Sequence, residues 1–214
     1  MSLLEIVDNS KTDKNTKHSY LDLYQKILVT KEDTATNILE IGILDGGSIK
    51  LWHDYFKNAT IFALDIMNIN NVWTEIKNKE RIILYTSHDA YDIERFKTTF
   101  LDKNIKFDIL IDDGPHTFDS MVMFIKLYSQ IMTSDGILII EDVPDWKWIK
   151  QLKDVVPDKL KQYIKVYDLR SNKNRFDDIV FTIDKCNNLT EHFMVNNNLT
   201  NKPTYYKKEY VEIL

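Results

Sequence analysis

The stretch of residues 107–148 constrains the fold more than any other part of the chain, because it holds two short apolar runs that both end in acids. The runs are Phe107–Ile111, followed by Asp112-Asp113, and Ile137–Ile140, followed by Glu141-Asp142. Residues 119–132 between them carry apolar side chains at helical spacing. The order strand, helix, strand predicts two parallel, neighbouring strands in a buried sheet.

Both acidic pairs are then expected at the carboxyl ends of parallel strands, the edge where open α/β sheets bind their ligands. His116 follows the first pair across a Gly114-Pro115 turn. Carboxylates and an imidazole around one crevice favour a divalent-metal site with a base. An acid after a strand is also common as a cap or turn residue, and this alternative stays open. Glu141 and Asp142 can face one ion only if the strand has ended, and Pro144 favours such a break.

The rest of the chain alternates between predicted strands and helices. Further strands are predicted at Asn37–Ile41, Thr60–Asp65, Arg81–Tyr85, Tyr163–Leu169 and Asp178–Ile183. Helices are predicted at Tyr20–Val29, Ile49–Phe56, Val72–Lys79, Ile93–Leu101 and Trp146–Val155. This alternation predicts an α/β protein with a doubly wound, Rossmann-like sheet of seven strands, mostly parallel. The polar loop Arg170–Asp177 shows no helical pattern, so the last two strands are expected to form a hairpin that adds an antiparallel terminal strand.

Composition narrows the classes of partner. The 214 residues fit one domain, and a net charge of −5 does not favour nucleic acid as a partner. No apolar run reaches the roughly 18–20 residues of a membrane span, so no membrane association is expected. The single Cys186 excludes an internal disulfide, and the N-terminus lacks a long apolar core. Together these features predict a cytoplasmic location.

A glycine-rich turn follows the strand Asn37–Ile41. Its glycines, Gly42, Gly46 and Gly47, allow a tight turn and a close approach of the backbone to a ligand. Leu44 replaces a glycine of the G-x-G-x-x-G pattern, so pyrophosphate binding is not predicted. Glu40 lies close to where a cationic ligand group would sit, and Asp65 is placed to accept hydrogen bonds from a ribose diol. A plain tight turn with a capping acid is the structural alternative.

The motif E-I-G-x-x-x-G-G-S, with an acid after the second strand, resembles class I S-adenosylmethionine-dependent methyltransferases. More narrowly, IDDGPH, IIED and DLRSNKNRFDDIV resemble the cephalosporin hydroxylase-like and macrolide-sugar O-methyltransferase group, as does TDKNTKHSYLDLY near the N-terminus. The similarity covers about residues 11–183. The chain departs from the group at Pro115, where serine is commoner.

The resemblance implies a divalent metal, usually magnesium, bound by residues that match Asp113, Glu141 and Asp142, with His116 as general base beside Asp113. The candidate residues for S-adenosylmethionine are Glu40, Gly42, Gly46, Gly47, Ser48, Asp65, Asp89 and Asp112. We expect an N-terminal helical segment at residues 1–30 that covers the cofactor site, a methyltransferase core at residues 31–184 and a C-terminal extension at residues 185–214. Only one histidine belongs to the acidic cluster, so non-haem iron chemistry, which usually needs two, is not expected.

The predicted reaction is methylation of a sugar hydroxyl, with a nucleotide-linked sugar or a glycan precursor as substrate. One alternative is a polyketide, an antibiotic or another small molecule; another is a non-catalytic binding or assembly protein that keeps the fold. Candidate substrate-binding residues are Trp146, Arg170, Arg175 and Asp178. Core packing for Trp146 and surface ion pairs for the charged residues are equally compatible with the sequence. His18 and Tyr20 either close over the cofactor or start an ordinary helix, and a homo-oligomer is left open.

Overall fold

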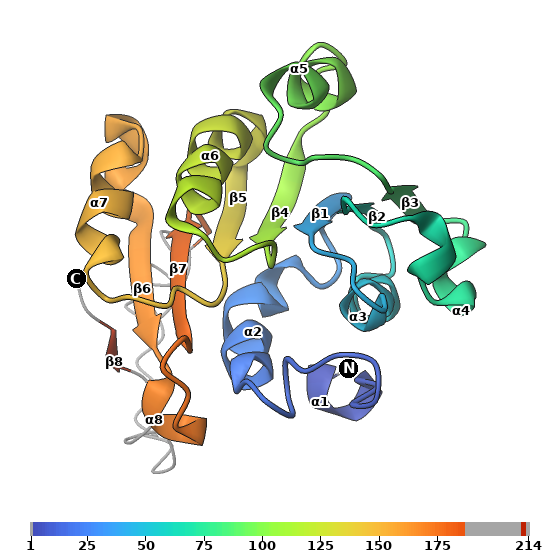
Figure 1. Cartoon of the computed structure of the whole chain (residues 1–214), viewed down its shortest axis with the longest axis horizontal. Helices are drawn as coiled ribbons and strands as arrows, with labels where there is room; N and C mark the ends of the chain where they lie inside the picture. Colours follow the sequence, from blue (N-terminus) through green and yellow to red (C-terminus); the bar gives the residue numbers. More distant parts are fainter. Residues whose placement is uncertain (1, 187–210, 213–214) are drawn as a thin grey trace, which may run out of the picture.

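The computed structural model describes residues 2–186 and a two-residue strand at 211–212, which form one mixed sheet with helices on both faces (Figure 1). The strands are β1 (Asn37–Ile41), β2 (Thr60–Leu64), β3 (Ile82–Tyr85), β4 (Phe107–Asp112), β5 (Met132–Ile140), β6 (Ile164–Asp168), β7 (Ile179–Asp184) and β8 (Val211–Glu212). Their order is β3-β2-β1-β4-β5-β7-β6-β8. Strands β1 to β5 pair in parallel, and β7 runs antiparallel to both β5 and β6.

This topology confirms the predicted doubly wound α/β architecture and its antiparallel hairpin. Strand β8 pairs with β6 and lies beyond the seven strands that the sequence predicts. Most of the predicted C-terminal extension, residues 187–210 and 213–214, lies outside the described residues.

The helices mostly agree with the predicted ranges. They are α1 (Leu3–Ile6), α2 (Tyr20–Leu28), α3 (Gly47–Tyr55), α4 (Thr74–Lys77), α5 (Ile93–Phe96), α6 (Phe118–Tyr128), α7 (Trp148–Val155) and α8 (Arg170–Lys173). The prediction that residues 170–177 contain no helix is wrong, since α8 forms one turn there. Asn174 ends this turn in the left-handed conformation, at φ 55°. A single turn is too short to show helical periodicity in a sequence.

Alternate residues of the central strands face two separate cores, because side chains along a strand point to opposite faces. Ile38 and Ile109 pack in the core that also holds apolar side chains of α1 to α4. Leu39 and Leu110 pack in the second core, with apolar side chains of α5, α6 and α7. Burial on both faces explains why these strands are continuous apolar runs in the sequence.

The carboxyl ends of β1, β4 and β5 are locked side by side. Ile41 is the register partner of Asp112, and Asp112 is the partner of Ile140. Gly42, at φ 93°, follows β1, and a Cβ atom there would lie 2.0 Å from the backbone oxygen of Asp113. Only glycine permits this approach, which places the acids after β4 and β5 next to the glycine turn.

The N-terminal segment, residues 8–28, packs against this edge of the sheet, and in Figure 1 α2 lies beside the arrowhead of β4. A Cβ atom on Gly47, at the start of α3, would lie 2.2 Å from the backbone oxygen of Lys11. Gln25 on α2 donates a hydrogen bond to the Tyr55 hydroxyl at 2.9 Å, which joins α2 to α3. Among residues 2–186, none of the helices has the length and apolar character that a bilayer crossing requires.

Candidate active site

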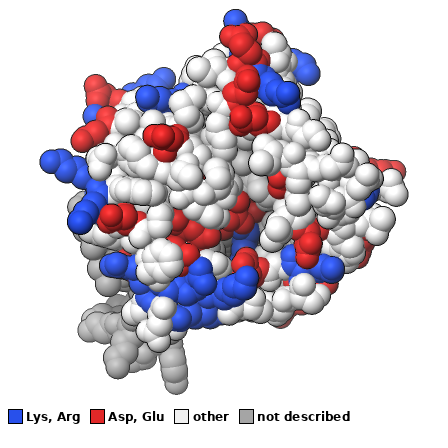
Figure 2. Space-filling view, viewed as in Figure 1, with Lys and Arg blue, Asp and Glu red and all other residues white. Residues whose placement is uncertain are grey.

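A cleft of about 610 Å³ opens at the carboxyl edge of the sheet. The predicted site residues that line it are Gly42, Asp65, Asp89, Asp113, His116 and Asp142. Figure 2 shows acidic side chains in the middle of this face, with lysine and arginine side chains gathered below them. The structure therefore brings residues from the turns after the five parallel strands, from Gly42 to Asp142, into one cavity with a concentration of negative charge.

Asp113, His116 and Asp142 form the centre of the cleft. One ligand-type atom from each lies within 4.8 Å of the others. His116 Nε2 is 3.7 Å from Asp113 Oδ1 and 3.6 Å from Asp142 Oδ2. His116 and Asp142 both have left-handed backbone conformations, at φ 52°, which are costly for residues other than glycine. Such strain persists where the surrounding structure imposes it, and it is common at functional sites.

The predicted break after β5 is confirmed, because the strand ends at Ile140 and Asp142 turns into the left-handed region. The turn separates the two adjacent acids. Asp142 faces His116, whereas Glu141 is buried, with its Oε1 accepting from the Tyr24 hydroxyl and its Oε2 accepting from Lys14 at 2.6 Å. Glu141 thus lies beside the three-residue cluster with both oxygens bonded, and its role as a metal ligand stays a prediction.

Lys14 is the site residue that the sequence analysis missed. Its ammonium lies 2.7 Å from Asp113, 2.6 Å from Glu141 and 3.2 Å from Glu40, and only 1% of the residue is exposed. Burial lowers the pKa of Lys14, but the three carboxylates raise it by more, so the group stays charged. The motif TDKNTKHSYLDLY contained the signal, yet nothing in the local pattern separates Lys14 from its neighbours Lys11 and Lys17.

The same segment supplies two more contacts to the acids. The Tyr20 hydroxyl donates to Asp142 Oδ1, and His18 Nδ1 lies 3.2 Å from the same oxygen. His18 also bonds to Asp178, at 2.7 Å. Burial lowers the pKa of His18, but the Asp178 hydrogen bond and the charges of Asp142 and Asp13 raise it above the usual histidine value.

The predicted cofactor residues divide into two groups. Asp65 lines the cleft and accepts backbone hydrogen bonds from Ile43 (2.7 Å), Leu44 (3.3 Å) and Met67 (2.9 Å). Asp89 also lines the cleft and accepts from the Tyr91 backbone at 2.9 Å. Gly46, whose Cβ position would meet Ile76, lies outside the cleft lining, as do Glu40, Gly47, Ser48 and Asp112.

Strand geometry explains the position of Glu40. It shares a face of β1 with Ile38, so its side chain points under α2 and α3. There it accepts a hydrogen bond from Trp52 Nε1 at 2.6 Å and pairs with Lys14. Gly47 approaches the Lys11 backbone, and Ser48 is buried. The close approach predicted for the glycine turn is thus made in part to the N-terminal segment of the same chain.

The predicted substrate residues lie toward α8 and are engaged within the chain. Arg170 makes two hydrogen bonds to Asp168 (2.8 and 2.6 Å) and lies over the Trp146 ring, 5.6 Å from its centroid. Arg175 makes two hydrogen bonds to Asp177 (3.0 and 2.6 Å). In this structure both arginines therefore form the ion pairs that the sequence left open as an alternative, and their substrate roles stay predictions. Asp178 is fully buried against His18.

Comparison with known proteins shows which proteins this chain resembles in sequence. No family model matches the chain. It is 26% identical over 138 residues to L-olivosyl-oleandolide 3-O-methyltransferase of Streptomyces antibioticus, covering 61% of this chain and 34% of that protein. It is 27% identical over 139 residues to mycinamicin VI 2''-O-methyltransferase of Micromonospora griseorubida, covering 61% and 33%. The matched region thus spans about a third of the length of these curated relatives.

Solved structures of methyltransferases superpose on this chain. The MycE methyltransferase from the mycinamycin pathway, in complex with Mg, S-adenosylhomocysteine (SAH) and mycinamycin VI, superposes with a TM-score of 0.68 at 19% identity. The match covers 96% of this chain and 57% of MycE. The structure titled cmcI-D160 Mg-SAM superposes with a TM-score of 0.52 at 17% identity, covering 78% and 72%.

The strand order, the antiparallel hairpin and these superpositions show the class I methyltransferase fold. The chain is similar in sequence to O-methyltransferases that are named for macrolide and tetracenomycin sugars, and the resemblance carried by its motifs is confirmed.

The electrostatics of the site lead to a first prediction, on Asp112. Burial, helped by the charge of Asp113, raises the pKa of this carboxyl to about 7, although Tyr91 donates a hydrogen bond to it at 2.5 Å. A carboxyl with a raised pKa in the folded state reduces the free energy of unfolding as the pH rises from about 4 to about 7. In metal-free protein, Asp112→Asn should remove this loss. As the pH rises toward 7, the free energy of unfolding of the variant should therefore rise relative to that of the wild type, by about 1.4 kcal/mol for each unit by which the folded-state pKa of Asp112 exceeds its unfolded-state pKa.

Urea denaturation between pH 4.5 and 8 measures the effect. Asp102→Asn, at an exposed position, controls for the amide substitution itself. If the difference in the free energy of unfolding between Asp112→Asn and wild type did not change with pH, the raised pKa of the Asp112 carboxyl would be contradicted.

Proposed function

We propose that this chain is the catalytic domain of an O-methyltransferase that uses S-adenosylmethionine and a divalent cation to methylate a sugar hydroxyl. The observation that carries the proposal is the meeting of Asp113, His116 and Asp142 in one cleft with Asp65, at the carboxyl edge of a class I methyltransferase sheet. The names of the relatives support the reaction type, and the superposed structures with Mg and SAH or SAM support both cofactors.

The donor set fits a hard divalent cation. Asp113 Oδ1 and Asp142 Oδ2 both face His116 across the cleft, and carboxylate oxygens are preferred ligands of Mg²⁺. Burial raises the pKa of Glu141 and of Glu40, and the neighbouring carboxylates raise it further, against the effect of Lys14. The single ammonium of Lys14 therefore does not balance the acids around it. When bound, a divalent cation offsets this charge and stabilises an alkoxide as a Lewis acid.

The cleft also fits S-adenosylmethionine, which supplies a methyl group on a sulfonium. Asp65 accepts three backbone N–H groups, and a carboxylate offers about four acceptor sites, so its capacity for a ribose hydroxyl is not exhausted. Leu44 and Ile66 line the cleft and are 67% and 75% exposed, which leaves apolar surface for a flat ring such as adenine.

His116 is positioned to accept the proton of the substrate hydroxyl. Its Nε2 atom lies between Asp113 and Asp142 without a short hydrogen bond to either, and its side chain is 36% exposed to the cleft. A neutral imidazole in this place can take a proton from a hydroxyl held beside it. Asp113, which is bonded to Lys14 through Oδ2, keeps Oδ1 on the side of His116.

For the acceptor, a sugar on a polyketide or a similar small molecule is better supported than a nucleotide-linked sugar. The relatives are named for olivosyl, rhamnosyl and mycinamicin substrates. Arg170 and Arg175, the predicted substrate residues whose charge would suit the diphosphate of a nucleotide-linked sugar, are instead paired with Asp168 and Asp177. A non-catalytic binding or assembly role has less support, because the acids, His116 and the cleft are all present.

Chelation tests the proposal most simply. With S-adenosylmethionine and a glycosylated polyketide acceptor, EDTA should abolish methyl transfer and added magnesium should restore it, because the alkoxide loses its counter-ion. Formation of SAH is the readout, and elemental analysis confirms that the metal is gone. Full turnover by the metal-free protein would show that the acids have another role.

His116→Asn gives the sharpest test of the base. Asparagine tolerates the left-handed backbone that His116 adopts, so the substitution removes the basic nitrogen with little added strain. Turnover should fall by roughly 10²–10⁴-fold, because an amide cannot accept the proton. Cofactor affinity should stay within a few-fold of wild type, as measured by SAH calorimetry. A folded variant with near-normal turnover would leave the cation alone to activate the hydroxyl.

A further inference from the structure

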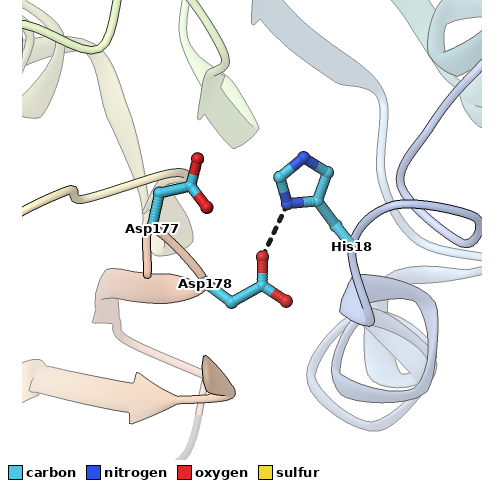
Figure 3. Close-up of side chains that lie close together, drawn as sticks. All are labelled: His18, Asp177 and Asp178. Atoms are coloured by element: carbon cyan, nitrogen blue, oxygen red, sulfur yellow. Dashed lines mark hydrogen bonds and ion pairs between the residues drawn. The ribbon is translucent and has the colours of Figure 1, made fainter. Parts of the chain in front are cut away.

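His18 is buried between two carboxylates that come from distant parts of the chain. Its Nδ1 atom lies 2.7 Å from Asp178 Oδ1 and 3.2 Å from Asp142 Oδ1. Figure 3 shows the ring of His18 turned toward Asp178, beside Asp177. A ring nitrogen that faces two carboxylate oxygens must carry the hydrogen, so Nδ1 donates to this pair. Asp178 immediately precedes β7, and it ties the N-terminal segment to the far side of the site.

The two oxygens of Asp142 have different surroundings. Oδ1 accepts a hydrogen bond from the Tyr20 hydroxyl and lies beside His18. Oδ2 faces the cleft, 3.6 Å from His116 Nε2. Two side chains of the N-terminal segment thus hold one oxygen, and the carboxylate presents the other to the proposed cation site. This arrangement also accounts for the left-handed backbone of Asp142, which needs a surrounding structure that imposes it.

We propose that His18, held by Asp178, and Tyr20 are positioning residues that fix Asp142 for cation binding. The inference rests on the proposed function, since it takes Asp142 as a ligand of the cation. Hydrogen-bond partners behind a metal ligand typically change metal affinity or activity by 10–100-fold when they are removed. The cation site is then complete only when the N-terminal segment is docked against β7, although neither His18 nor Tyr20 contacts the cation.

The surroundings of Asp178 argue against the alternative that this residue only anchors the N-terminal segment for stability. The residue is fully buried, and its Oδ2 atom has no hydrogen-bond partner among the described residues. A buried carboxylate oxygen without a partner is costly. An anchor selected for stability would be expected to satisfy both oxygens. Asp178 Oδ1 lies 3.7 Å from Arg175 Nε, but its short hydrogen bond, at 2.7 Å, is to His18, whose ring it holds beside Asp142.

A second cation site at His18, Asp177 and Asp178 is the main alternative, because ligand-type atoms of these residues also lie within 4.8 Å of one another. Both oxygens of Asp177 are bonded to Arg175, at 3.0 and 2.6 Å. His18 Nδ1 is likewise engaged with Asp178. These contacts favour a positioning role over metal binding at this cluster.

The test compares two variants that keep an aromatic ring in place. His18→Phe removes the donor but retains a ring against Tyr20, whose centroid lies 4.8 Å from that of His18. Tyr20→Phe removes only the hydroxyl that bonds Asp142. Calorimetric titration of the full chain with Mn²⁺, in the presence of SAH, should show a 10–100-fold rise in the metal dissociation constant for each variant. The dissociation constant for SAH, measured separately, should stay within about threefold.

Two further variants separate positioning from stability. Lys31→Met removes another buried charge, whose ion pair to the half-exposed Asp135 at 2.6 Å lies outside the cleft, so it should lower the melting temperature without changing metal affinity. His18→Asn keeps an N–H donor near the Nδ1 position, so it should recover part of the affinity that His18→Phe loses. Under saturating metal, the weakened variants should regain turnover, which a purely structural defect would not do.

Three results would overturn the inference. Folded His18→Phe and Tyr20→Phe proteins with wild-type metal affinity would show that Asp142 needs neither partner. An equal loss of affinity in Lys31→Met would attribute the effect to stability. Two Mn²⁺ ions per wild-type chain, one of them lost in His18→Phe, would make His18 a ligand. A wild-type chain that binds no divalent ion would overturn the proposed function together with this inference, whereas the three results above leave the proposed function intact.

Discussion

The ammonium of Lys14 is the interaction on which the candidate site depends. It joins the ends of three parallel strands, through Glu40 on β1, Asp113 after β4 and Glu141 after β5. Removing one member of such a buried pair typically costs about 3–5 kcal/mol, because it leaves an uncompensated charge. Lys14 thus lets several carboxylates converge at a buried sheet edge, and it makes the N-terminal segment part of the site.

This arrangement explains why the acids at this edge of the sheet make different contacts. Those nearest the core, Glu40 and Glu141, are bonded to Lys14, Trp52 and Tyr24. Asp113 and Asp142 each use one oxygen for the N-terminal segment and turn the other toward His116. The inner carboxylates therefore hold the segment in place, while the outer ones remain available to the cleft.

The sequence predicted the sheet and its acidic edge because both follow from local patterns. The apolar runs before Asp112 and Glu141 specify buried strands, and the parallel order of those strands brings their ends together. Glu40 shows where such patterns fail, since its contact with the N-terminal segment depends on the face of β1 and on packing of α2 and α3. Lys14 contacts Asp113 across 99 positions and His18 contacts Asp178 across 160 positions, and the local pattern of the sequence does not single out these residues for such contacts. The one-turn helix α8 was missed because four residues cannot display a period of 3.6.

The central claim is that Asp113 and Asp142 hold a divalent cation beside His116, with Lys14 balancing the remaining charge. Anomalous diffraction from crystals grown with Mn²⁺ and SAH tests it most directly. The account predicts one anomalous peak in the cleft, at coordination distances of about 2.0–2.6 Å from oxygens of both Asp113 and Asp142. An empty cleft in crystals that contain SAH, or a peak bound by neither of these carboxylates, would contradict it.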